Sequence, residues 1–141
     1  MKTAIIILSL VFITSLAFGT FAYITFRNSE AILTAKADEF TEKGKNLSIP
    51  ECIQEVLDWE KTCPAMQVLC DHYALKIWGN CFESKSRKEE CSDLIKADPA
   101  VHTSRYGVAQ CEPYRPSKRI VKICGQLHMA SIDFCEKALS L

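Results

Sequence analysis

The sequence predicts an all-α fold: a small disulfide-stapled domain of about four helices after an N-terminal transmembrane or signal helix. The chain of 141 residues opens with one long apolar segment, carries eight cysteines, and repeats its apolar residues at helical spacing. No segment shows the alternation of apolar and polar residues that is typical of a half-buried strand. We therefore expect a cysteine-rich helical domain at 48–141, preceded by a stalk or linker at 27–47.

The N-terminal segment, residues 4–26, contains neither charge nor proline. As a helix it is long enough to cross the hydrocarbon core of a bilayer. The alternative is a cleaved signal peptide, because the small residues Ala17 and Gly19 would permit cleavage before Thr20, and a second such pair would permit it before Tyr23. The residues after these sites remain apolar, which favours an uncleaved membrane anchor. A secreted protein is the alternative.

The cysteine content indicates the compartment. Eight cysteines exceed ordinary usage, and an even number suits four disulfides, which require an oxidising environment. We expect an extracytoplasmic location, in a periplasm or at a cell surface. The positive-inside rule favours the opposite orientation, because four basic residues follow the apolar segment whereas only Lys2 and the α-amine precede it. Those four are Arg27, Lys36, Lys43 and Lys45. We give the cysteines more weight, since cytosolic thiols without metal-ligand spacing would be harder to explain.

Capping and breaking residues divide the rest of the chain into helices. Ser48 with Glu51, and Ser86 with Glu89, have the spacing of a capping box, which marks a helix start. Gly79-Asn80 is expected to stop a helix. The expected helices are 50–62, 64–78, 86–97 (ending before Asp98-Pro99) and 117–139, and the connection 99–116 is expected to be mostly irregular, with a turn or two of helix at 101–109.

Four cysteines predict a doubly crosslinked helical hairpin. Cys52, Cys63, Cys70 and Cys81 read C-x10-C-x6-C-x10-C. Residues eleven apart share a helix face, because eleven residues rotate only about 20° beyond three turns. An antiparallel hairpin would pair Cys52 with Cys81 and Cys63 with Cys70, and would place Val56 opposite Ile77 and Trp59 opposite Ala74. The inner bridge requires residues 64–69 to form the turn, since bridged Cα atoms lie within about 7 Å; otherwise these cysteines pair elsewhere.

The other four cysteines are expected to form disulfides that join the last helix to the middle of the chain. Their spacing does not determine the pairing among Cys91, Cys111, Cys124 and Cys135. No C-x2-C motif typical of zinc sites or redox thiols is present. The cysteines are therefore expected to be structural.

No catalytic constellation can be named. Lysine plus arginine and aspartate plus glutamate each total 17, so nucleic acid is not an expected partner. The chain has no G-x-S-x-G elbow and no glycine-rich phosphate loop, and His72, His102 and His128 have no spaced carboxylate that suggests a triad. We expect no enzyme, cofactor or metal. A thiol-redox or enzymatic factor is the alternative, and it would need a free reactive cysteine.

One basic stripe is a candidate binding site. Arg115, Lys118, Arg119 and Lys122 recur at helical spacing at the start of the last helix, where positive charge is unfavourable. The stripe could meet an anionic lipid headgroup or an acidic partner, or it could be a solvated helix start. The leading hypothesis is a non-enzymatic, membrane-tethered extracytoplasmic module that binds or scaffolds another protein, in an oligomeric state left open. A secreted cysteine-rich effector is the alternative.

Overall fold

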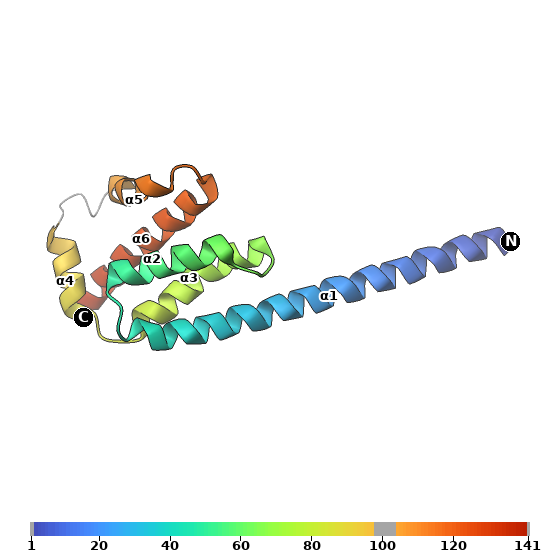
Figure 1. Ribbon diagram of the computed structural model, residues 1–141, viewed down its shortest axis with the longest axis horizontal. Helices are drawn as coiled ribbons and strands as arrows, with labels where there is room; N and C mark the ends of the chain where they lie inside the picture. Colours follow the sequence, from blue (N-terminus) through green and yellow to red (C-terminus); the bar gives the residue numbers. More distant parts are fainter. Residues whose placement is uncertain (1, 98–103, 141) are drawn as a thin grey trace.

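The computed structural model describes residues 2–97 and 104–140, and these residues form helices and no strand. The expected all-α, disulfide-stapled class is confirmed (Figure 1). The elements are α1 (Lys2–Gly44), α2 (Ile49–Thr62), α3 (Gln67–Glu83), α4 (Lys88–Ala97), α5 (Ser104–Gln110), the 3₁₀ helix η2 (Glu112–Tyr114) and α6 (Lys118–Leu139).

The first half of α1 projects away from the rest of the molecule as an isolated rod (Figure 1). Its large apolar side chains from Ile6 to Phe26 are exposed, and Phe18 reaches 79% exposure. By length and composition this helix could cross a membrane, and the apolar window is not buried against any part of the described chain. So large an exposed apolar surface is stable only when another apolar medium covers it.

The second half of α1 belongs to the core. The helix continues without a break to Gly44, and Leu33, Ala37 and Phe40 are buried against the domain. The segment 27–47 is thus largely helical, as a stalk would be, but from Ser29 onward it packs against the domain, chiefly beside α3, instead of standing clear of it. Leu33, Ala37 and Phe40 are spaced by four and three residues, so they form one apolar face of the helix although most of the residues around them are polar or charged.

Helices α2 and α3 form an antiparallel hairpin. Disulfides join Cys52 to Cys81 and Cys63 to Cys70, with Cα–Cα distances of 6.0 and 6.2 Å, which is the nested arrangement. The inner bridge is feasible because α2 ends at Thr62 and α3 begins only at Gln67, so residues 63–66 make the turn. The facing residues Val56, Trp59, Ala74 and Ile77 are all buried. At the start of α2 the Glu51 carboxylate accepts a hydrogen bond of 2.7 Å from the Ser48 backbone N–H, as in a capping box.

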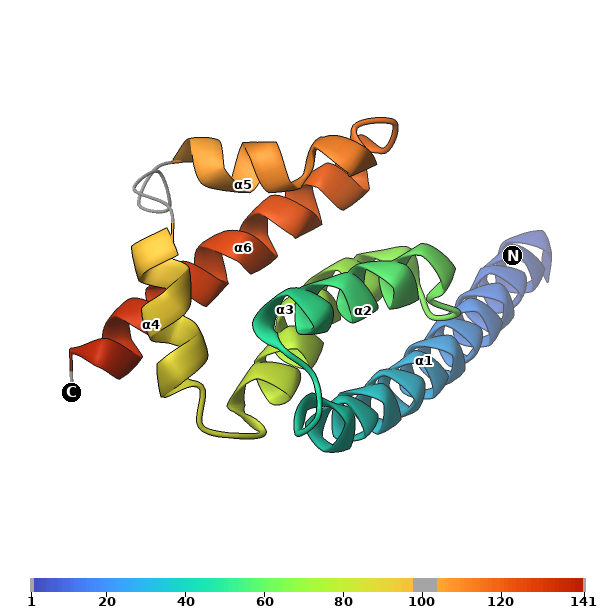
Figure 2. The same ribbon diagram turned by 60° about the vertical axis from the view of Figure 1, so that its left-hand side comes forward.

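The C-terminal half packs two shorter helices on α6. Figure 2 shows α4 crossing α6 near the C-terminus and α5 beside α6, both on the side away from α1. Disulfides join Cys91 of α4 to Cys135 and Cys111, directly after α5, to Cys124. Helix α6 begins as expected, and its N-cap Ser117 accepts a hydrogen bond from the Ile120 N–H.

Three expected boundaries are wrong. Helix α3 begins at Gln67 and not at residue 64, because residues 63–66 form the turn that the inner disulfide requires. Gly79-Asn80 does not end α3, which continues to Glu83, because the Asn80 amide donates to the Ala37 carbonyl of α1 at 3.0 Å and holds the helix in register. Helix α4 begins at Lys88, so Arg87 and not Ser86 stands directly before it.

The connection expected to be mostly irregular is largely helical over the part that the structure describes, as α5 and η2. The Asp98-Pro99 break, His102 and the start of the 101–109 segment lie outside the described residues.

Candidate functional site

A groove of about 510 Å³ lies where the end of α3, the start of α4 and the last turns of α6 meet. Its lining residues are Glu83, Lys85, Ser86, Arg87, Lys88, Phe134, Lys137 and Ala138. Figure 1 places this region, beside α4 and the C-terminus, at the end of the domain opposite the apolar half of α1. We call it the distal groove.

The floor of the distal groove is apolar and fixed. Phe134 is half-buried, and its ring meets Phe82 edge to face with 4.6 Å between centroids. Phe82 is itself fully buried and packs against Trp78 at 4.8 Å. A half-buried aromatic ring that is held by a buried one offers apolar contact area that loses little side-chain entropy on binding.

Lysines form the rim. Lys85 is half-buried and pairs with Glu90 at 3.1 Å. Lys88 and Lys137 are exposed, and neither makes an ion pair within the described part of the chain. Glu83 is the one acidic residue of the lining. The rim therefore carries a positive excess around an apolar floor, which favours an anionic, partly apolar ligand.

Arg87 holds the base of the groove in place. Its side chain is 1% exposed, and its guanidinium pairs with Glu90 at 3.1 Å. Four backbone carbonyls accept hydrogen bonds from it: Gly44, Leu47, Cys81 and Phe82, at 2.7 to 3.1 Å. These carbonyls belong to the ends of α1 and α3 and to the loop after α1, where no helical partner remains. Burial lowers the pKa of Arg87, and the Glu90 carboxylate opposes that shift.

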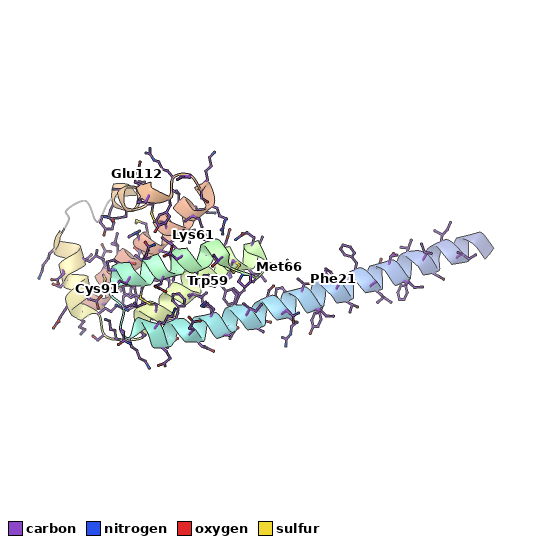
Figure 3. The ribbon with its side chains drawn as sticks, in the orientation of Figure 1. Phe21, Trp59, Lys61, Met66, Cys91 and Glu112 are labelled. Carbon is purple, nitrogen blue, oxygen red and sulfur yellow. A yellow bond between two sulfur atoms is a disulfide. The ribbon has the colours of Figure 1, made fainter. Side chains whose placement is uncertain are left out.

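The disulfide Cys91–Cys135 joins the two walls. It connects α4 to α6 with a Cα–Cα distance of 5.0 Å, and Cys135 directly follows Phe134. Figure 3 labels Cys91 at this end of the molecule. Since Lys88 and Cys91 are one turn apart on α4, the bridge fixes the lysine rim relative to the aromatic floor.

The four residues of the predicted basic stripe do not act together. Arg119 forms ion pairs with Glu60 and with Asp71, the latter at 2.6 Å. Arg115 pairs with Glu112 at 2.9 Å. Two of the four charges are thus neutralised by carboxylates of the same chain. Lys118 and Lys122, one turn apart on α6, are exposed. The stripe as an anion site stays a prediction that now rests on these two lysines.

The Glu60, Asp71 and Arg119 cluster was not expected from the sequence. The Glu60 side chain is fully buried, and its Oε2 atom has no hydrogen-bond partner. Burial raises the pKa of Glu60 to about 7, the neighbouring Asp71 adds to the shift, and Arg119 opposes it. Burial also disfavours ionised Asp71, but hydrogen bonds from Arg119, Glu60 and Gln67 outweigh it and lower the pKa of Asp71. The two carboxyl groups and the arginine are therefore coupled, and Glu60 is the carboxyl that binds a proton more readily.

One group of side chains resembles a metal site by distance. The potential ligand atoms of Cys111, Cys124 and His128 lie within 4.8 Å of one another. Both sulfurs, however, form the disulfide Cys111–Cys124, so neither is a thiolate able to ligate a metal. Burial lowers the pKa of His128, and its ring meets Tyr106 edge to face at 5.8 Å. The group is a packed disulfide with an aromatic neighbour.

All eight cysteines are in disulfides, so the chain offers no free thiol for redox chemistry. Comparison with protein-family models, with characterised proteins and with solved structures finds no match. The disulfides, the helical fold and the apolar N-terminal helix fit an extracytoplasmic protein, either membrane-anchored or secreted.

Proposed function

We propose that this protein is a membrane-tethered extracytoplasmic module, without enzymatic activity, that uses the distal groove to bind an acidic and apolar segment of another protein. The uncleaved apolar half of α1 is the tether, and the stapled domain is the binding unit. The proposal treats the lysine rim as the source of charge selectivity and the aromatic floor as the source of contact area.

The observation that carries the proposal is a fixed aromatic floor inside a rim of lysines. Phe134 is held by Phe82, and the walls are held by Arg87 and by the Cys91–Cys135 bridge. A site whose backbone and side chains are already ordered loses less entropy when a ligand binds. A partner segment with one large apolar side chain flanked by carboxylates would satisfy both the floor and the rim.

The position of the groove supports a protein partner over a lipid. It lies at the end of the domain opposite the apolar half of α1 (Figure 1), so a tethered chain would hold it away from the membrane surface. A partner reaching it would approach from the extracytoplasmic space or from a neighbouring membrane protein of comparable height.

Fluorescence anisotropy with a labelled peptide, Leu-Phe flanked by glutamates, tests the proposal on the full oxidised chain in nanodiscs. Lys88→Glu with Lys137→Glu is expected to weaken binding by about tenfold or more, because two attractive charges become repulsive. The matched control, Lys118→Glu with Lys122→Glu, reverses two exposed lysines elsewhere on α6 and is expected to leave the affinity within about twofold of wild type. Loss of binding in the control variant alone would assign recognition to the basic stripe.

Intact mass of chain recovered from its native membrane or medium separates tethering from secretion. The tethered form keeps its full mass, whereas a secreted effector lacks the residues before Thr20 or Tyr23. Alkylation without reduction is expected to modify no cysteine, since all eight are paired. Alkylation of eight thiols in native material would contradict the oxidising compartment.

A further inference from the structure

The turn between α2 and α3 lies beside the point where α1 leaves its apolar segment. The Met66 backbone N–H donates to the Ser29 hydroxyl at 3.4 Å. Ser29 is only three residues after Phe26, the last residue of the apolar segment. In Figure 3, Met66 is at the end of the domain nearest Phe21, whose side chain stands on α1 with no other element beside it.

Helices α1 and α3 run side by side in the same direction. Met66 contacts Ser29, and at the other end of the pair the backbone of Cys81 lies against Gly44. The Ser29 contact sets the level of Met66 along α1. Val68 follows two residues later in the same direction, which places it near the level of residue 31.

These levels correspond to the headgroup layer of a bilayer. At a rise of 1.5 Å per residue, Met66 is about 4.5 Å and Val68 about 7.5 Å beyond Phe26 along the α1 axis. The polar layer on each side of a bilayer is about 5 to 7.5 Å thick outside a hydrocarbon core of about 30 Å. If the apolar segment fills the core, both side chains lie within this layer.

The chemistry of the turn matches that location. Residues 62–70 contain no charged side chain, and the ring closed by the Cys63–Cys70 disulfide fixes their shape. Val68 is 78% exposed and Met66 47% exposed, so the described parts of the chain leave most of Val68 and about half of Met66 uncovered. The nearest charged residues, Lys61 and Asp71, lie directly before and after this segment.

We propose that the disulfide-closed α2–α3 turn is a second membrane contact, in which Met66 and Val68 insert into the headgroup layer of the leaflet from which α1 emerges. The proposal rests on the tether of the proposed function. A domain that is attached by a single transmembrane helix can rotate about the axis of that helix. A second contact with the membrane fixes the orientation of the domain. The turn would thereby set the direction in which the distal groove faces.

Methionine methyl NMR on the full chain in phosphatidylcholine nanodiscs, with and without a lipid that carries a spin label near the headgroup, tests the contact. Met66 is 47% exposed, and Met129 on α6, 37% exposed, is an internal control of similar exposure. The Met66 methyl signal is expected to broaden severalfold more than that of Met129. Val68→Asp is expected to reduce the broadening of Met66 to the level of Met129, because a carboxylate disfavours insertion.

The matched variant is Val108→Asp, which places the same charge at a valine of α5 that is 65% exposed, and it is expected to leave the broadening of Met66 unchanged. Equal broadening of Met66 and Met129 in chain that remains in the discs would overturn the inference and leave the tether intact. Chain that fails to enter the discs would overturn the tether and this contact together.

Discussion

Replacing Glu60 by glutamine should remove a pH dependence of stability that the buried cluster creates. The Glu60 side chain is fully buried, and burial raises its pKa from 4.5 to about 7. A carboxyl whose pKa is higher in the folded state holds its proton more tightly there than in the unfolded chain. Its stabilising effect is therefore complete below about pH 4.5 and is lost as the pH rises through about 7.

The magnitude follows from the shift. At 1.36 kcal/mol for each pKa unit, a rise from 4.5 to about 7 corresponds to about 3 kcal/mol of stability lost between acidic and neutral solution. Glutamine has the same shape but does not ionise, so the Glu60→Gln variant should lack this slope. Its free energy of unfolding should exceed that of wild type above about pH 7 and fall to or below it in acid.

Urea unfolding of the oxidised chain in detergent, followed by circular dichroism across this pH range, measures the slope. Glu89→Gln is the matched control, because it removes an exposed carboxyl on α4 without touching the cluster, and it should keep the wild-type slope. A wild-type profile without a decline towards neutral pH, or a Glu60→Gln variant that retains the decline, would refute the reasoning.

Four further variants test the packing and one disulfide. Gly44→Ala should destabilise the fold by about 1 to 3 kcal/mol, because the added Cβ would lie 2.7 Å from a Cα atom of α3. Gly79→Ala is the control, since nothing lies within 4 Å of its added Cβ, and it should raise the stability by about 0.5 to 1 kcal/mol. Thermal unfolding measures both. Arg87→Lys should lower the free energy of unfolding by about 3 kcal/mol, since one ammonium cannot serve four carbonyls; a loss below about 1 kcal/mol would contradict this. Serine at both Cys91 and Cys135 should lower stability by about 4 kcal/mol and weaken peptide binding at the distal groove; unchanged affinity would show that the bridge does not shape the site.

The helical hairpin could be predicted from spacing alone because both disulfides obey one geometric rule. The steps of four, three and four residues on each helix place two cysteines and two packing residues on one face, and the structure buries all of them except Cys63, which is half-buried. The same reasoning fails at Gly79-Asn80. There, a hydrogen bond from Asn80 to α1 and the packing of Cys81 outweigh the low helix propensity of both residues.

The groove and the carboxyl cluster were harder to predict. Arg87 acts on backbone carbonyls, which have no sequence signature, so nothing in the chain marks it as buried. Glu60 could have been found: Ile53, Leu57 and Glu60 step by four and three residues, so its side chain shares their buried face. The basic stripe on α6 was predicted to act as one binding site because its residues share a helix face. Their spacing could not show that carboxylates of other helices pair with Arg119.

Helix α1 contains no cysteine, whereas all four disulfides lie between Cys52 and Cys135. The cross-linked part of the molecule is therefore held to its rod by the backbone of residues 45–48 and by non-covalent contacts, which include the packing around Leu33 and Phe40 and the hydrogen bonds that Asn80 and Arg87 donate to α1. One proteolytic cut in that short connection would leave every bridge intact while making release of the domain a reversible dissociation. If α1 is a membrane tether, shedding would then depend on how firmly α1 adheres to α3, and could be reversed by rebinding.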